Sequence, residues 1–261
     1  MVHTWNNSFF SIIIPTLNEE HYISLLLNDL DKQTFKDFEV IIVDAKSKDK
    51  TREKAEKFKD KFRIFRFIIS NKKNVSHQRN LGAKFAKADW IIFFDADNRL
   101  PVNFLKEIKN HIKSKKVDLL SSLISSDSQL LKYKLLVTWM NSYIQFLQFL
   151  KQNRLNEAFL CIRTKVFREL GGFGTYQPGE GNDLLKRSRE KKYVFENLKY
   201  PKYTFSLRRL RKDGTFIFAL KYAYLETLGM LNIGPFKKIG YKLYPMGGNR
   251  YKNKSTRSYT N

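Results

Sequence analysis

The sequence lacks the residues that a disulfide framework or a membrane span would need. Of its 261 residues only Cys161 is a cysteine, which excludes internal disulfides and a cysteine-based metal cluster and is typical of a reducing compartment. No run approaches ~18 uninterrupted apolar residues, so we expect no membrane-spanning helix. Met1 to Phe10 has no basic segment followed by an apolar one, so we expect no signal peptide. These absences favour a cytoplasmic location, with contact to the inner face of a membrane as a further hypothesis.

Acidic residues are also scarce. The chain has 25 Asp and Glu against 49 Lys and Arg, a formal net charge of +24, and from Gly234 to the end it has no acid at all. Such an excess points to an anionic partner, which could be nucleic acid, an acidic membrane surface or a phosphorylated substrate. Charge alone does not choose among these. Hydrophobic residues make up 42% of the chain, which is enough for a real core.

Short apolar runs alternate with amphipathic segments through the first hundred residues. The apolar runs are rich in β-branched and aromatic residues and predict strands, at residues 9–14 (closed by Pro15), 40–43, 63–69 and 90–94. Between them, apolar residues at helical spacing predict helices at residues 21–30, from a Ser47 or Asp49 cap to about Lys59, and at 75–86. This alternation predicts an open α/β fold with a mostly parallel sheet and helices on both faces.

The pattern is less regular after Pro101. We expect a helix to about Ser114, a strand at 119–122, a long amphipathic helix at 130–150, a strand at 159–162 with a short helix to Leu170, a basic helix from about Leu184 to Arg189, edge strands at 194–196 and 203–207, and an aromatic amphipathic helix at 215–231. The expected division is a ligand-binding half at residues 1–100, a second half of the same domain at 101–231, and a mobile basic tail at 232–261.

The strand at 90–94 ends at two carboxylates. Trp90 to Phe94 is apolar without alternation, which predicts a strand buried on both faces, and Asp95 and Asp97 follow it with Ala96 between. Ligands of open α/β sheets bind beyond the carboxyl ends of the strands. Mg²⁺ and Mn²⁺ take oxygen ligands, commonly one or two carboxylates together with substrate phosphates. The alternative is a simple turn that caps the helix opening near Pro101.

Four segments resemble the family 2 glycosyltransferases, which have the nucleotide-sugar-binding fold called GT-A. In the family's order they are Ile-Ile-Ile-Pro-Thr-Leu-Asn-Glu at 12–19, Val-Ile-Ile-Val-Asp-Ala-Lys-Ser-Lys-Asp-Lys-Thr at 40–51, Arg-Asn-Leu-Gly at 79–82 and Phe-Asp-Ala-Asp at 94–97. Each alone is weak. Together they cover roughly residues 11–99 at the family's usual spacing.

The resemblance implies metal-dependent, inverting transfer of a sugar from a nucleotide-diphosphate sugar to the hydroxyl of a glycan or lipid-linked acceptor. It implies Mg²⁺ or Mn²⁺ held by Asp97 and, less directly, Asp95. The donor-binding residues that it implies are Pro15, Thr16, Asn18, Glu19, Asp44, Arg79, Asp95, Ala96 and Asp97.

The second half resembles the family less tightly. Glu-Gly-Asn-Asp-Leu-Leu-Lys-Arg at 180–187 falls where many members have Glu-Asp-x-Asp-Leu-x-x-Arg, so Gly181 replaces the aspartate usually assigned as catalytic base. Either Glu180 or Asp183 supplies the base, or the alignment slips by two. We favour Asp183, because a carboxylate at the entrance of a helix beginning near Leu184 is held ionised by amide donors and the helix dipole. The alternative for Asp183 is a plain N-cap.

A basic segment, with Arg208, Arg209 and Arg211, resembles one that clamps a diphosphate or acceptor in some members, although such runs are often solvated faces. Three rivals stay open. The first is a nucleotide-sugar-binding protein with impaired catalysis, which stays possible because Gly181 replaces the usual base. A nucleic-acid-binding protein fits the charge, but no module of that class is present, so we expect no nucleic acid. A sugar-phosphate nucleotidyltransferase would need a glycine-rich first loop, and residues 15–20 have no glycine.

Overall fold

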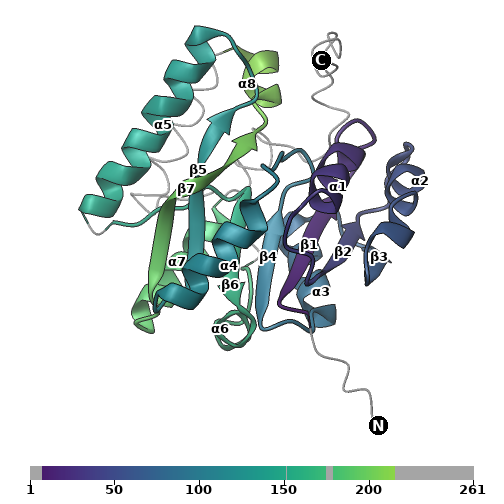
Figure 1. Ribbon diagram of the computed structural model, residues 1–261, viewed down its shortest axis with the longest axis horizontal. Coiled ribbons are helices and arrows are strands. Elements are labelled where there is room, and N and C mark those ends of the chain that lie inside the picture. The colour runs from purple at the N-terminus through teal and green to yellow at the C-terminus, as the bar shows by residue number, and fades with distance from the viewer. Residues whose placement is uncertain (1–7, 151, 175–178, 215–261) are drawn as a thin grey trace.

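One seven-stranded sheet forms the centre of the molecule in the computed structural model, which describes residues 8–150, 152–174 and 179–214 (Figure 1). Its strand order is β3-β2-β1-β4-β6-β5-β7. The strands are β1 (Phe10–Thr16), β2 (Phe38–Asp44), β3 (Phe65–Ile69), β4 (Trp90–Phe94), β5 (Leu119–Ser126), β6 (Phe159–Arg163) and β7 (Phe195–Phe205). The sheet runs through both expected halves of the domain.

The sheet is mostly parallel, as predicted. Strands β1, β2, β3 and β4 pair in parallel, and so do β5 and β7. The exception is β6, which lies antiparallel between β4 and β5. The carboxyl ends of β1, β2 and β4 therefore share one edge of the sheet.

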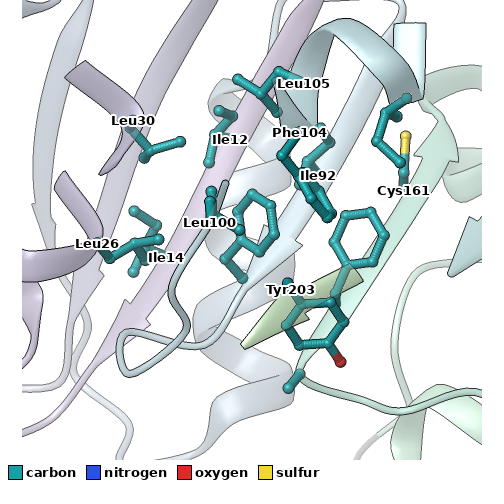
Figure 2. Packing of buried hydrophobic residues seen from close by; sticks show 14 of the residues in the cluster. Ile12, Ile14, Leu26, Leu30, Ile92, Leu100, Phe104, Leu105, Cys161 and Tyr203 are labelled. Carbon is teal, nitrogen blue, oxygen red and sulfur yellow. The ribbon is translucent and has the colours of Figure 1, made fainter. Parts of the chain in front are cut away.

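Helices cover both faces of the sheet, which confirms the α/β prediction. Alternate strand residues explain the two layers: Ile12 and Ile92 point to one side, whereas Ile13 and Ile91 point to the other. The first side packs against α1 (Ile23–Asp31), α4 (Phe104–Ser114) and α5 (Leu131–Phe149). Figure 2 shows this layer, where Leu26 and Leu30 of α1 and Phe104 of α4 meet the sheet. The second side packs against α3 (Val75–Phe85), α6 (Thr164–Glu169) and α7 (Glu180–Glu190).

In the first half the structure differs from the prediction at element ends. Strand β1 does not close at Pro15 but continues to Thr16. Its pairing with β4 ends at Ile13, and beyond that point only β2 is hydrogen-bonded to it, so the missing N–H of Pro15 breaks no ladder on the β4 side. The helix expected to reach Lys59 is shorter: α2 (Thr51–Glu56) precedes a separate 3₁₀ turn at Lys59–Lys61.

Two differences in the second half matter more. The two expected edge strands are one continuous edge strand, β7, with a register shift opposite Ser122 and Ile124 of β5. Helix α7 begins at Glu180 rather than near Leu184, with Gly179 at its N-cap in a left-handed conformation (φ 112°). A last short helix, α8 (Arg208–Asp213), carries the basic segment. The expected helix at 215–231 and basic tail at 232–261 lie outside the described residues.

Within the described ranges, no helix is both long and apolar enough to cross a bilayer.

Candidate active site

Polar residues lie at the carboxyl ends of β1, β2 and β4, and those of β1 and β2 are in direct contact. Thr16 is the last residue of β1 and pairs in register with Asp44, the last residue of β2. The Thr16 hydroxyl donates to Oδ2 of Asp44 over 2.9 Å, and Asp44 also accepts from the backbone N–H of Ser47. Asp95 follows β4 directly and donates its N–H to the carbonyl of Ala158 (3.1 Å). The parallel strands therefore bring their polar ends together, as the sequence predicted.

A buried arginine of α3 organises one side of this edge. The side chain of Arg79 is 2% exposed, and its Nη2 donates to Oδ1 of Asp95 (2.8 Å) and to the carbonyl of Glu157 (2.9 Å). Its Nη1 donates to Oε1 of Glu180 (3.1 Å). Burial opposes the charge of this guanidinium, but Asp95 and Glu180 outweigh it and hold the pKa of Arg79 above its ordinary value. Arg79 therefore holds Asp95 and Glu180 in place, and its contact with a donor stays a prediction.

A second buried arginine, Arg208 of α8, organises the other side. Its Nη1 and Nη2 donate to the two carboxylate oxygens of Glu19 over 2.7 and 2.9 Å, and its Nε lies 2.9 Å from Oδ2 of Asp97. The guanidinium lies over the ring of Tyr22, 4.8 Å from the ring centroid. Burial raises the pKa of Glu19, while Arg208 opposes that shift. Arg208 thus joins the first loop to Asp97, whereas the sequence suggested a direct clamp on a diphosphate or acceptor.

Each aspartate of the Asp-Ala-Asp segment is held through one oxygen. Asp95 uses Oδ1 for Arg79, and Asp97 uses Oδ2 for Arg208. Among the described residues, no hydrogen bond is formed to Oδ2 of Asp95 or to Oδ1 of Asp97. Two carboxylate oxygens with this freedom fit Mg²⁺ or Mn²⁺. The described chain has no cluster of three or more acidic, His or Cys side chains that could hold a metal, so the remaining ligands would have to come from phosphate and water.

The loop after β1 is fastened to the loop after β2. The backbone N–H of Asn18 donates to the hydroxyl of Ser47 (2.7 Å), and the side chain of Asn18 accepts from the N–H of Lys48 (2.8 Å). The N–H of Glu19 donates to the hydroxyl of Thr51 (2.8 Å). Asn18 has a φ of 55°, a left-handed conformation that asparagine tolerates better than most residues. These contacts fix the expected nucleotide-side loop without any glycine.

The structure overturns the argument made for Asp183. Because α7 begins at Glu180, Asp183 lies inside the first turn and is not an N-cap. Its Oδ2 accepts from Nε and Nη2 of Arg187 (3.0 and 2.8 Å), and Arg187 also donates to the carbonyl of Gly172. Asp183 therefore belongs to an ion pair on α7 that is tied to the Gly-Gly-Phe turn.

Glu180 is the expected base that does lie beside Asp95, through their shared contact with Arg79. It is almost completely buried, at 3% exposed. Burial, together with the neighbouring Glu157 carboxylate, raises the pKa of Glu180 to about 8. A carboxyl with that pKa is mostly protonated at neutral pH and is then unable to accept a proton.

Arg211 of the basic segment is paired with an aspartate other than Asp95 and Asp97. Arg211 forms a two-pronged pair with Asp127, over 2.8 and 2.7 Å. Asp127 also accepts the N–H of Leu207 (3.1 Å), so this pair fastens α8 to the loop after β5. Arg209 is half-buried on α8. Direct contact of either residue with a diphosphate stays a prediction.

The sequence gave no sign of Glu157 and Tyr22. Glu157 lies in the loop before β6, and its Oε1 accepts from the N–H groups of Gly181 (2.9 Å) and Asn182 (3.3 Å) at the start of α7. No motif surrounds it, so only the unusual glycine at 181 could have drawn attention to that position. Tyr22 lies within the helix expected at 21–30, where its spacing indicates only an apolar position; in the structure it precedes α1.

Comparison with known proteins agrees with this geometry. Residues 11–171 match the family described as glycosyl transferase family 2. The poly(ribitol-phosphate) β-N-acetylglucosaminyltransferase TarS of Staphylococcus aureus is 35% identical over 114 residues, 42% of this chain and 20% of TarS. The β-1,3-glucosyltransferase WfgD of Escherichia coli is 35% identical over 107 residues, 39% of this chain and 42% of WfgD. The matched region thus spans less than half the length of these curated relatives.

Solved structures show the same fold over most of the chain. The TarS 1–349 complex with UDP-GlcNAc has a TM-score of 0.60 and 25% identity, over 74% of this chain and 57% of that one. A mannosyltransferase of Pyrobaculum calidifontis, solved with GDP-Man and Mn²⁺, has a TM-score of 0.66 and 16% identity, over 90% of this chain and 68% of that one. The latter identity supports the GT-A fold alone. Since the family match extends over more than half of the residues, the chain belongs to glycosyl transferase family 2.

Proposed function

We propose that this protein transfers a sugar, with inversion, from a nucleotide-diphosphate sugar to an acceptor hydroxyl, and that Mg²⁺ or Mn²⁺ assists at Asp95 and Asp97. One observation carries the proposal. At the carboxyl edge of the parallel strands, two aspartates are each fixed by a buried arginine through one oxygen and retain the other for a ligand. A structural turn would not need this double anchoring.

The donor class is supported by the proteins that share the fold. TarS has been solved with UDP-GlcNAc and the P. calidifontis mannosyltransferase with GDP-Man and Mn²⁺. For this chain we propose a nucleotide-diphosphate sugar of either base. The names of TarS and WfgD refer to a polymer of ribitol phosphate and to a diphosphoundecaprenol-linked sugar. A glycan or lipid-linked sugar is accordingly the acceptor class that we propose.

The residues of the chain would divide the work as follows. Asp95 and Asp97 would hold the divalent ion, which when bound neutralises charge on the diphosphate leaving group. Arg79 and Arg208 keep the two carboxylates in place before the donor arrives, so little reorganisation is needed on binding. The loop at 15–19, fastened through Ser47 and Thr51, would form the nucleotide side of the site.

Thermal stabilisation by donors tests this proposal. UDP-Glc, UDP-GlcNAc, UDP-Gal and GDP-Man would each be added with Mn²⁺, with Mg²⁺ and with excess chelator. A ligand that binds the folded state alone raises the melting temperature as its concentration exceeds the dissociation constant. We expect one donor to stabilise the protein in a metal-dependent way and Asp97→Asn to abolish that shift. Asp60→Asn, which removes an equal charge from the exposed 3₁₀ turn, is the matched control. Equal stabilisation with chelator present would refute the metal role.

A second candidate is a nucleotide-sugar-binding protein without transfer activity. The observation that favours it is Gly181, which leaves no side chain where the family resemblance places the base. The two candidates differ in one measurement, the release of nucleoside diphosphate from a donor that binds. Sustained release identifies an enzyme, whereas tight binding with no release over hours identifies a binding protein.

A further inference from the structure

The space beside Gly181 is filled by the side chains of another segment. A Cβ atom on Gly181 would lie 3.0 Å from Cγ of Glu157, 3.2 Å from its Oε1 and 3.0 Å from Cδ1 of Leu155. These distances are closer than side-chain carbons normally allow, and the constraint is one of space because the residue lies within regular helix. Position 181 lacks a side chain, and the carboxylate of Glu157 occupies the volume that one would fill.

Glu157 also differs from the other glutamates and aspartates considered for the site. Glu19 is paired with Arg208, Asp183 with Arg187 and Glu180 with Arg79. In the part of the chain that the structure describes, no lysine, arginine or histidine lies within ion-pair distance of the Glu157 carboxylate. Its hydrogen bonds come from backbone N–H groups at the start of α7. Glu157 is half-buried and retains some access to solvent.

The position of Glu157 is fixed relative to the proposed metal ligands. Nη2 of Arg79 donates both to the Glu157 carbonyl and to Oδ1 of Asp95. One guanidinium nitrogen therefore holds the backbone of Glu157 and the first aspartate together. The amides of Gly181 and Asn182 then set the direction of the Glu157 side chain, so its backbone and its carboxylate are each held by hydrogen bonds.

On this geometry, and resting on the glycosyl transfer proposed above, we infer that Glu157 is the catalytic base and that its carboxylate substitutes for the side chain missing at Gly181. Glu157 takes the proton of the acceptor hydroxyl as that oxygen bonds to the anomeric carbon. The bond from the anomeric carbon to the diphosphate oxygen breaks, and its electron pair leaves with the nucleoside diphosphate. The protonated Glu157 then returns its proton to solvent. Water can serve as the acceptor in the same way, which gives hydrolysis of the donor.

The ionisation of the two glutamates agrees with this assignment. Burial raises the pKa of Glu157, while the charge of Arg79 and the amide donors of Gly181 and Asn182 oppose the rise. A base works best when its pKa lies near the working pH. Glu180, with its pKa near 8, instead keeps a proton at neutral pH and serves as a buried partner of Arg79.

The test is Glu157→Gln in the full chain. Glutamine keeps an oxygen that accepts from the amides of Gly181 and Asn182, so the fold and the melting temperature should be retained. The assay is release of nucleoside diphosphate with water as acceptor, using the donor that stabilises the wild type. We expect the release rate to fall at least about 100-fold, the usual scale for loss of a general base, with the donor dissociation constant within about twofold. The rate of the wild type should rise with pH as this carboxyl ionises, and the rise should be absent from Glu157→Gln. Glu107→Gln, on the exposed side of α4, is the matched control.

A second test moves the carboxylate from position 157 to position 181, so that the conclusion does not depend on Glu157→Gln alone. Glu157→Ala opens the volume beside position 181, and Gly181→Asp then fits if the flexible end of Leu155 shifts slightly. The double variant should release nucleotide at least about ten times faster than Glu157→Ala alone. Less than a tenfold loss in Glu157→Gln, or a rate loss matched by an equal loss of donor affinity, would overturn the assignment. A wild type that binds none of the donors would refute the proposed function itself and not this inference alone.

Discussion

At the scale of single residues, the site is built on two arginines that are almost completely buried. Arg79 and Arg208 are 2% and 7% exposed, and each holds two carboxylates from distant parts of the chain. Buried charges are costly to desolvate and persist only when they are paired and hydrogen-bonded. These pairs orient Asp95 and Asp97, and they make the site sensitive to the loss of any one partner.

Arg208→Met should destabilise the protein because it leaves the Glu19 carboxylate, 7% exposed, without its two-pronged partner. Losing one member of a buried pair costs about 3–5 kcal/mol. Urea denaturation would measure this, and Glu19→Gln added to Arg208→Met should recover part of the loss by removing the unpaired charge. Arg52→Met is the control, since its pair with Glu56 is exposed and such pairs contribute about 0–1 kcal/mol. Equal effects of the two arginine variants would contradict the prediction.

Glu180 should make stability depend on pH in a particular direction. In the unfolded chain this carboxyl ionises near its ordinary pKa of 4.5, whereas in the folded protein its pKa is about 8. Folding takes up a proton between these values, so the contribution of Glu180 to the free energy of unfolding falls as pH rises from 4.5 to 8. Glu180→Gln removes that dependence.

The melting temperature of Glu180→Gln, taken relative to wild type, should therefore increase with pH across this window and level off above pH 8. Glu53→Gln, on the exposed side of α2, controls for the loss of one negative charge. A relative melting temperature that falls with rising pH would show that Glu180 is ionised in the folded protein.

At the scale of elements, the Arg-Asn-Leu-Gly segment at 79–82 is explained by the packing of α3. Gly82 faces β1 and β2, where an added Cβ would lie 2.5 Å from Cγ2 of Ile13 and 3.1 Å from Cγ2 of Val43. This close approach lets Arg79, one turn earlier, reach Asp95. Asn80 donates to the carbonyl of Phe173 (2.8 Å) and accepts its N–H (2.9 Å). The packing of Gly82 and the hydrogen bonds of Asn80 thus fix the position of Arg79.

Gly82→Ala should cost about 1–3 kcal/mol of stability, because the added methyl group cannot be accommodated between α3 and β1 without a backbone shift. Such a shift also moves Arg79, so metal-dependent donor stabilisation should weaken in the same variant. Chemical denaturation and the donor thermal-shift assay would measure the two effects. Ala83→Gly, at the next position of the helix, controls for helix propensity. A Gly82→Ala protein as stable as wild type would contradict the prediction, because it would show that a methyl group fits between α3 and β1.

At the scale of the whole molecule, the sequence predicted the features that depend on burial, which are the central strands and the polar residues at their carboxyl ends. Strands β1, β2 and β4 lie in the middle of the sheet and are buried on both faces, so their apolar runs have no competing explanation. Their carboxyl ends carry Thr16, Asp44 and Asp95, and the convergence of these residues follows from parallel pairing. The Asp-Ala-Asp segment was found for the same reason.

Features that depend on distant contacts were not predictable. The apolar run of β6 has no signal for its antiparallel direction, and β7 was divided because a polar stretch with Pro201 interrupts its pattern, as an edge strand allows. The start of α7 was missed because glycines on both sides of Glu180 are typical of a loop. Glu157 and Leu155 fill the space that a side chain at position 181 would need, and no local sequence pattern contains that information.

The exposed face of α5 and the net charge lead us to expect contact with an anionic membrane surface. Helix α5 lies on the outside of the sheet near β5 and β7 (Figure 1). Its exposed apolar residues recur at helical spacing. Leu131, Leu135, Trp139, Phe146 and Phe149 are all at least half exposed. The chain as a whole has a formal charge of +24. An amphipathic helix on a strongly basic protein binds anionic interfaces by burying its apolar face while the charges are attracted to lipid headgroups.

We therefore expect the full chain to co-sediment with vesicles containing phosphatidylglycerol at low salt, and to bind phosphatidylcholine vesicles much less. Trp139→Ser combined with Phe149→Ser should lower the partition coefficient onto these vesicles at least about tenfold. The reason is that burying each large apolar side chain contributes about 1.5–3 kcal/mol. Raising the salt to about 0.5 M should weaken binding as well, because screening shortens the range of the attraction. Ile69→Ser, at the end of β3 on the opposite edge of the sheet and 43% exposed, is the control for losing an exposed apolar side chain. Binding that is unchanged by the α5 substitutions but lost at high salt would show that charge alone makes the contact. No binding at low salt would refute the expected contact with an anionic membrane.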